Sequence, residues 1–329
     1  VYNAIFGGVT EVENFYRTDI YVSAAGRLAG AGTAADPISS LPVAFGLADP
    51  DGDATIHIMG TVTYTKFVTP LGSGTLTFVG EGTDATLALT GDMIRLGAGA
   101  RFDNLTLRRN TGIAYLALGW NNAEFTETVK TAGNFYMLCG NLLFEGNFAK
   151  TAADDAASAG SSADQTVTVN GGRYMFLVGG NYRLFGTSPF ATYSGNLTLH
   201  IGAGATVAAN GMNGFAGQNY LTGSVHATVA GTLSGNFRDY TIPGKTEGQR
   251  YEAFRNTGKV TVETVDGAAL TRIIAGDLNR DGKVDLADAL LLCKAAADGS
   301  LDAAVQPYYH GLTEVGLADV CTALAKLAK

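Results

Sequence analysis

The feature that most constrains this chain is its series of short β-type segments separated by glycine, asparagine, aspartate and serine. From about residue 20 to residue 265, apolar and polar side chains alternate within each segment, as they do in half-buried strands. Examples are Thr55-Ile56-His57-Ile58, Asn104-Leu105-Thr106-Leu107, Thr166-Val167-Thr168-Val169 and Asn196-Leu197-Thr198-Leu199. No amphipathic helix of ordinary length interrupts the series. A mainly β fold is therefore predicted for most of the chain.

The segments resemble one another, which favours a solenoid over a sandwich or a barrel. Residues 95–102 (RLGAGARF) recur as residues 200–207 (HIGAGATV), and residues 133–141 (GNFYMLCGN) are echoed by residues 172–181 (GRYMFLVGGN). Gly-Asn-Phe triplets begin at Gly146 and Gly235. Each coil of a solenoid repeats the same bends, and Gly or Asn supplies the left-handed backbone of a tight corner. The pattern predicts a parallel β-helix with coils of about 20 residues.

Composition and charge narrow the function classes. Glycine, with 44 of 329 residues, is assigned to turns because no G-X-Y period is present. The net charge of −8 and the absence of a Lys/Arg cluster argue against nucleic acid or a membrane surface as partners. No apolar run approaches the roughly 18 residues of a membrane-spanning helix. The chain begins Val1-Tyr2-Asn3 without a Met or a basic, apolar leader, which suggests a mature or trimmed protein whose export signal is not shown.

The three cysteines, Cys139, Cys293 and Cys321, are too few and too scattered for a disulfide framework. They are expected to be buried small apolar residues, and a Cys293–Cys321 disulfide is the alternative.

The pattern changes between residues 266 and 276, after the last strand-like segment. Farther on, apolar residues take helical spacing. They are Leu286, Ala289, Leu290 and Cys293, followed by Leu317, Val320, Leu324 and Leu327. Two domains are predicted, a β-helix over residues 1–268 and a small α-helical module over residues 269–329.

Residues 277–288 (DLNRDGKVDLAD) fit the calcium loop of an EF-hand, with Asp instead of Glu in the last position. A chain that wraps once around Ca²⁺ turns alternate oxygen-bearing side chains toward the ion. An acidic surface turn with coincidental spacing is the alternative. The predicted ligands of one Ca²⁺ ion are the side chains of Asp277, Asn279, Asp281, Asp285 and Asp288 and the backbone carbonyl of Lys283.

Residues 276–292 resemble the first repeat of a dockerin, in which a calcium loop is followed by its exiting helix only. A second repeat is marked by residues 315–319 (VGLAD), which align with residues 284–288 (VDLAD). Of the side-chain ligands only Asp319 survives there, so the second loop is expected to have lost its ion. The other corresponding positions hold Tyr308, His310, Leu312 and Gly316.

The resemblance to dockerins implies a partner, because dockerins bind cohesin domains of scaffoldins or cell-surface anchors in cellulosome-type complexes. Cohesin contacts of the family correspond here to Leu286, Ala287, Cys293 and Lys294, with Leu317 and Ala318 in the second repeat. For Leu286, core packing is the alternative role.

Residues 21–60 resemble the entry of right-handed β-helix proteins of the pectate-lyase-like superfamily. The resemblance is carried by YVSAAG (21–26), AGTAADPI (31–38) and IHIMG (56–60). In that superfamily the segment corresponding to residues 41–47 is a short helix that covers the open end of the coil stack. The resemblance also implies right-handed winding.

The fold by itself carries no enzymatic activity. The N-T-D, G-H-D and R-I-K clusters of polygalacturonase-like enzymes are missing, and His57, His200, His226 and His310 have no acidic neighbour in sequence. A lyase remains possible if Asp103, Glu124 and Glu145, each about one coil apart, form a calcium-binding ladder with Arg108 or Arg109 as base.

Three further features of the sequence bear on the fold and on binding. Residues 49–53 are expected to be an exposed turn rather than a second calcium motif, and residues 151–164 an insertion from one coil. Aromatic side chains are assigned to the core more readily than to a sugar-stacking platform. They are Phe135, Tyr136, Tyr174, Phe176 and Tyr182.

The sequence thus predicts a secreted, extracellular protein of a cell-surface complex. Its β-helix is expected to serve in carbohydrate binding, adhesion or structure, and its calcium-dependent module is expected to dock to the complex. The rival function is a polysaccharide lyase or glycoside hydrolase acting on pectin-like polysaccharide. A cleft with grouped carboxylates and Arg or Lys would favour the enzyme, and a flat polar or aromatic face would favour binding.

Overall fold

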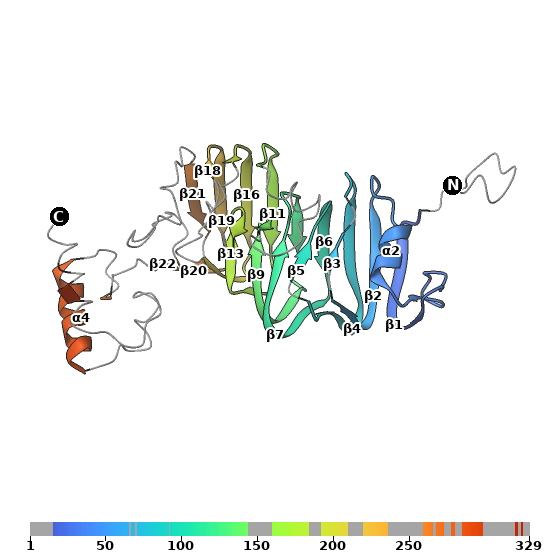
Figure 1. The fold of residues 1–329 in the computed structure, drawn as a ribbon, viewed down its shortest axis with the longest axis horizontal. Helices are drawn as coiled ribbons and strands as arrows, with labels where there is room; N and C mark the ends of the chain where they lie inside the picture. Colours follow the sequence, from blue (N-terminus) through green and yellow to red (C-terminus); the bar gives the residue numbers. More distant parts are fainter. Residues whose placement is uncertain are drawn as a thin grey trace, which may run out of the picture.

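The structure is a computed structural model of the chain. It describes residues 16–65, 67–69, 71–91, 93–143, 160–183, 192–209, 220–235, 259–265, 268–272, 278–279, 285–298, 320–321 and 324. Within these residues the protein is mainly β, and every strand pair is parallel. Figure 1 shows the strands stacked side by side along the long axis of the molecule. The predicted parallel β-solenoid is confirmed, and its right-handed sense stays a prediction.

The coils have three faces, which we call face A, face B and face C. Face A consists of β1 (Asp19–Arg27), residues 54–59 of β2 (Ala54–Tyr64), residues 75–81 of β4 (Thr75–Leu89), β6 (Gly99–Asp103), β8 (Ala123–Phe125), β11 (Gln165–Val169), β16 (Asn196–Ile201), β19 (Ser224–Val229) and β21 (Lys259–Thr264). Because β2 and β4 bend past a corner, their second halves belong to face B.

Face B is formed by residues 61–64 of β2, 86–89 of β4, 106–109 of β7 (Thr106–Ala117) and 130–132 of β9 (Lys130–Leu138). It continues through β12 (Arg173–Tyr174), β17 (Thr206–Ala209), β20 (Thr232–Gly235) and β22 (Ala269–Arg272).

Face C comprises β3 (Phe67–Val68), β5 (Met93–Arg95), residues 113–117 of β7, residues 134–138 of β9 and β13 (Phe176–Val178). Two short pairs complete the strands, β10 (Leu142–Leu143) with β14 (Tyr182–Arg183) and β15 (Thr192–Tyr193) with β18 (Tyr220–Leu221).

The coils differ in length. Hydrogen-bonded residues on successive coils are 22, 24 and 23 positions apart near the start, as for Asp53 and Thr75. Later spacings are 44, 32 and 28. The predicted coil of about 20 residues is therefore slightly short, and the 44-residue spacing contains the predicted insertion at 151–164, of which the structure describes only residues 160–164.

Alternation along face A buries one side chain per coil on a common interior ladder. Phe102 stacks on Phe78 at 5.0 Å and on Phe125 at 4.8 Å between ring centroids, with nearly parallel planes. Apolar residues extend this ladder in register on both sides, and all its members are at most 1% exposed. The ladder is Ile20, Ile56, Phe78, Phe102, Phe125, Val169, Ile201 and Val229.

The helix α2 (Leu41–Leu47) lies at the β1 end of the stack (Figure 1). It buries Leu41, Ala44 and Phe45, and the Phe45 ring meets Phe78 edge-on at 6.2 Å. The capping helix predicted at residues 41–47 is confirmed. Its apolar face covers the interior ladder that the first coil would otherwise expose.

Of the two pairs of similar sequence segments, one pair occupies equivalent places in stacked coils and the other does not. Residues 133–141 and 172–181 stack directly, with Tyr136 paired to Phe176 and the Asn141 N–H donating to Asn181 Oδ1 at 2.7 Å. Residues 95–102, however, turn from face C to face A, whereas residues 200–207 turn from face A to face B. A Gly-Ala-Gly turn fits both corners, because it only has to bend the chain tightly.

Asn104 was expected to begin a strand, but its backbone is left-handed, with φ of 47°. Its side chain instead donates to the Gly80 carbonyl of the previous coil at 2.8 Å, and β7 starts only at Thr106. Residues 49–53 form the predicted turn, and Asp53 Oδ1 accepts the Thr75 N–H of the next coil at 2.8 Å.

The C-terminal helix α4 (Leu286–Asp298) has its own small core, in which Leu278, Leu292, Ala295 and Val320 pack together. This cluster shares no residue with the solenoid core. Figure 1 shows α4 apart from the strands, beyond β21 and β22. The helix predicted from the apolar spacing after residue 286 is present.

Candidate functional site

The helix α4 divides into a buried and an exposed side. Asp288, Ala289, Leu292 and Ala295 are buried at helical spacing, and Leu292 and Ala295 pack with Leu278 and Val320. On the other side the two leucines Leu286 and Leu290, one turn apart, are each 62% exposed. The core-packing alternative for Leu286 is therefore wrong.

The remaining predicted partner-binding residues of α4 share this exposure in part. Ala287 and Lys294 are exposed, Cys293 is half-buried, and Leu291 is 41% exposed. Leu317 and Ala318 lie outside the described residues. An apolar stripe, defined by Leu286, Ala287, Leu290 and Leu291, thus runs along one side of α4.

Asp288 joins the two ends of the predicted calcium loop. Its carboxylate is buried, at 2% exposed, and accepts the Asn279 N–H on Oδ1 at 3.0 Å and the Asp285 N–H on Oδ2 at 2.8 Å. Asp285 Oδ1 in turn accepts the Ala287 N–H at 2.8 Å at the start of α4. These bonds hold the third, ninth and twelfth loop positions around one carboxylate.

The other predicted calcium ligands, Asp277, Asp281 and Lys283, lie outside the described residues, as do Tyr308, His310, Leu312 and Gly316. Within the described ranges, no group of three or more His, Cys, Asp and Glu side chains is arranged to hold a metal ion. The calcium site therefore stays a prediction from the loop sequence.

On face A the solenoid assembles a cluster that the sequence did not reveal. His57 on β2 stacks on Tyr21 at 4.1 Å, and its Nδ1 lies 2.6 Å from Glu81 Oε1 and its Nε2 lies 3.2 Å from Asp19 Oδ1. The contacts lower the pKa of Asp19, chiefly through the hydrogen bond with His57. His57 therefore ties together three successive coils.

A second cluster lies farther along face A, and it corrects the proposed carboxylate ladder. Glu124 is in register with Arg101, not with Asp103. Arg101 bonds to both carboxylates, to Asp103 Oδ2 at 2.8 Å and to Glu124 Oε2 at 3.1 Å. The ladder is wrong because the coil between them has 23 residues, and a 21-residue spacing misses the register. Glu145 lies outside the described residues.

Asp103 is further held by two hydroxyls. Thr126 Oγ1 and Thr128 Oγ1 each donate to Asp103 Oδ1 at 2.8 Å. Burial by itself would raise the pKa of Asp103, but the bonds from Thr126, Thr128 and Arg101 outweigh burial and lower it. Asp103 thus stabilises the fold as a carboxylate.

This shift predicts a pH dependence. A lowered pKa in the folded state means that stabilisation by Asp103 is complete above about pH 4, the ordinary range of Asp, and is lost as the pH falls through the folded-state pKa. Asp103→Asn should therefore cost about 1–2 kcal/mol of unfolding free energy at pH 7. Urea denaturation of both proteins at pH 7 and pH 2.5 measures the difference, which should shrink in acid. A difference of the same size at both pH values would contradict this role.

The two candidate lyase bases do not join these carboxylates. Arg108 lies on face B, and the Arg109 guanidinium donates to the carbonyls of Leu89 and Gly91. The arrangement of a calcium ladder beside an arginine base is therefore not formed by the described residues. Carboxylates grouped with an arginine do occur on face A. However, Asp103 and Glu124 are both already bonded to that arginine, Arg101.

The predicted aromatic platform separates into two sets. Phe135 and Tyr174 are fully buried in the solenoid core, as the core interpretation predicted. Tyr136 and Phe176 point outward on face C, where they meet at 4.2 Å within a second buried cluster with Met93 and Tyr115. The side chain of Tyr182 is outside the described set.

All three cysteines are free, so the alternative Cys293–Cys321 disulfide is not formed. Cys139 is buried, and burial raises the pKa of its thiol, as expected for a small apolar residue. Cys321 is exposed instead of buried.

One contact of the His57 cluster could have been predicted from the spacing of its residues in the sequence. Glu81 follows His57 by 24 residues, two more than the 22-residue register between their strands, whereas Asp19 precedes it by 38. Only the first of these contacts was open to prediction from coil length.

Comparison of the chain with protein-family models, with curated proteins and with solved structures finds no match. No helix among the described residues has the length and apolarity to cross a membrane.

Proposed function

We propose that this chain is an exported component of a multi-protein, cellulosome-type assembly. Its C-terminal module binds one Ca²⁺ ion, resembles a dockerin, and docks to a cohesin domain of a scaffoldin or cell-surface anchor. The solenoid that it carries binds carbohydrate or serves in adhesion or structure.

One observation supports docking above all, namely the apolar stripe of α4. Leucines that are 62% exposed on a helix whose opposite side is already packed are typical of a surface that a partner covers. The stripe contains Leu286 and Ala287, two positions that correspond to the cohesin contacts of dockerins. The position of Asp288, buried between the third and ninth loop residues, fits a loop that closes around one ion.

A charge placed in the stripe should abolish most of the binding. We expect Leu286→Asp to weaken binding to a cohesin by about 30-fold or more, because a central apolar contact contributes roughly 2 kcal/mol or more. Calorimetry of the full chain against a panel of cohesins, with calcium present, measures the affinity.

The matched control is Leu71→Asp, which makes the same change at a leucine of the solenoid that is 82% exposed. It should leave cohesin affinity unchanged. Wild-type affinity of Leu286→Asp, or failure of the whole cohesin panel to bind the intact chain, would overturn the docking proposal.

For the solenoid, the observation that favours binding over catalysis is that the described carboxylates of face A are engaged in ion pairs and hydrogen bonds within the protein. A glycan array with a parallel assay for released sugar ends separates the two functions. Chain cleavage of any polysaccharide would favour the rival lyase or hydrolase.

A further inference from the structure

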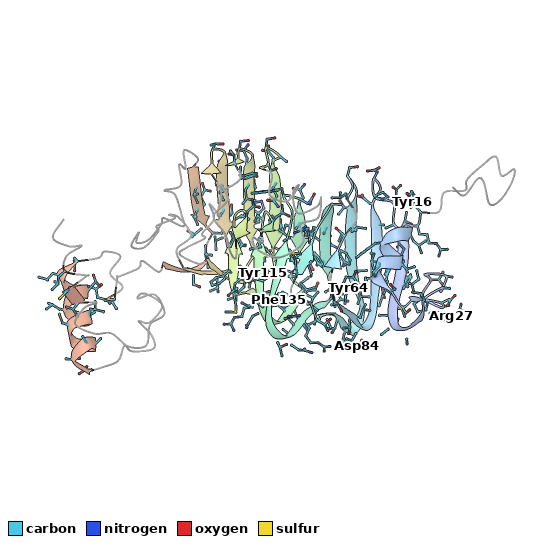
Figure 2. All side chains as sticks on the ribbon, in the orientation of Figure 1. Tyr16, Arg27, Tyr64, Asp84, Tyr115 and Phe135 are labelled. Carbon is cyan, nitrogen blue, oxygen red and sulfur yellow. The ribbon has the colours of Figure 1, made fainter. Side chains whose placement is uncertain are left out.

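The two ends of the solenoid differ in how the core is covered. At the β1 end, where Figure 2 labels Arg27, the helix α2 lies over the core, and Ile20 of β1 is fully buried. At the opposite end, Val260 and Val262 of β21 are only partly buried, and Val265 just after the strand is 48% exposed. The apolar interior is therefore incompletely covered at the β21 end.

Among the described residues, β21 is bonded along one edge only. Its register partners all lie on β19, and the Val265 N–H continues this bonding by donating to the Val229 carbonyl at 2.8 Å. Because the N–H groups of a strand point alternately to its two edges, those of Val260, Val262 and Thr264 point away from β19. A strand edge of this kind is a template for pairing with another strand.

The sequence of β21, KVTVET (259–264), is self-complementary in one antiparallel register. If two copies pair about a two-fold axis through Thr261, Val260 of each copy stands opposite Val262 of the other. These valines have their N–H groups at the free edge, so the main-chain hydrogen bonds can close in this register. The same register sets Lys259 opposite Glu263. Opposite charges on directly opposed residues stabilise a strand pair, and like charges destabilise it.

The charges select this register over its neighbours. Moving the axis by one residue in either direction keeps the free-edge groups opposed, but it sets Lys259 opposite Thr261 or Val265, without a charge pair. Glu263 is accessible to a second copy, since its side chain is 63% exposed and its contact with His226 is long, at 3.8 Å between Oε2 and Nε2.

We propose that two copies of this chain join end to end through the free edge of β21 and form a symmetric dimer with one continuous face A sheet. The two-fold axis stands perpendicular to face A, so inward side chains of both copies stay inward. Val260 and Val262 of each copy are then covered by the other copy. One strand pair is smaller than a standard interface, and we expect a weak dimer with a dissociation constant of roughly 1–100 μM.

The test is a charge swap followed by sedimentation velocity of the full chain over a range of concentrations that spans this dissociation constant. Glu263→Lys sets like charges opposite each other at both ends of the strand pair and should weaken dimerisation by about tenfold or more. Lys259→Glu should weaken it to a similar extent. The double variant Lys259→Glu/Glu263→Lys restores opposite charges and should dimerise like the natural protein.

The matched control is Glu127→Lys, which makes the same change at an exposed glutamate between β8 and β9, away from the β21 end. It should leave dimerisation unchanged. Trp120 fluorescence of every variant should match that of the natural protein, because each substitution lies outside the interior ladder.

The proposal is overturned if the chain stays monomeric throughout this range, if neither single reversal weakens association, if the double variant fails to restore it, or if Glu127→Lys weakens it equally. Cohesin binding of α4, measured on the same samples, is expected to be unchanged in every variant. Failure of the dimer is thereby distinguished from failure of the docking proposal.

Discussion

Asp281→Ala should abolish calcium-dependent binding of the chain to a cohesin while the solenoid stays folded. Asp281 occupies the fifth position of the loop, and with Asp277 and Asp288 it contributes negative charge that the bound ion would neutralise. Without the ion, these carboxylates repel one another across the loop. The loop would then no longer set the start of α4.

The dependence of docking on the ion follows from the position of the stripe. Leu286 and Ala287 lie within the loop sequence itself and also open α4. A loop that loses its shape therefore misplaces these contact residues directly. We expect cohesin affinity to fall beyond detection, at least 100-fold, in Asp281→Ala and equally in the natural protein with a chelator. Calorimetry of calcium binding to the full chain should give a stoichiometry near one.

The single tryptophan provides the internal control. Trp120 belongs to the solenoid, where its ring stacks on Tyr193 at 4.3 Å, and its fluorescence reports on that core only. Neither the chelator nor Asp281→Ala should change its emission, because the core of α4 and the solenoid core are separate. If cohesin affinity were unchanged in the presence of a chelator, the calcium loop would only stabilise the fold and would have no part in docking. Two tight calcium sites would show that the second repeat was aligned incorrectly.

The largest loss of stability is expected for Phe102→Ala. Phe102 is 1% exposed and lies between Phe78 and Phe125 in the interior ladder, so its removal breaks two ring stacks and leaves a cavity that neighbouring coils cannot close. We expect a cost of about 3–5 kcal/mol in the free energy of unfolding. Urea denaturation followed by Trp120 fluorescence measures it.

Two comparisons make this test specific. Phe102→Leu retains most of the volume and should cost clearly less, about 1–2 kcal/mol. Calcium binding should be the same in both variants, because Phe102 has no contact with the core around Leu292. A cost below 1 kcal/mol for Phe102→Ala would mean that the ladder is not packed as described.

The fold was accessible from sequence because its determinants are local. Alternation in segments such as residues 166–169 fixes which side chains point inward. The helix over residues 41–47 was instead predicted from the resemblance to β-helix proteins, with its correct bounds. The helix α4 follows from helical spacing in the same way, although spacing could not decide between core and surface for Leu286.

The register between neighbouring coils could not be predicted from the sequence. Coils of 22, 23, 24, 28, 32 and 44 residues stack on one another, because corners absorb insertions without disturbing the strands. A fixed offset therefore paired Glu124 with Asp103, whereas the sheet places it opposite Arg101. The same uncertainty concealed the contact of His57 with Asp19, which lies 38 residues before it.

The sequence by itself determined the strands, their inward and outward sides and the residues of the predicted calcium loop, since each depends on neighbours within one segment. Only the tertiary structure decided which outward side chains meet. It gathered carboxylates on face A and exposed Leu286 on α4. The physical reason is that lateral contacts in a solenoid join residues whose distance along the chain depends on the length of every corner between them.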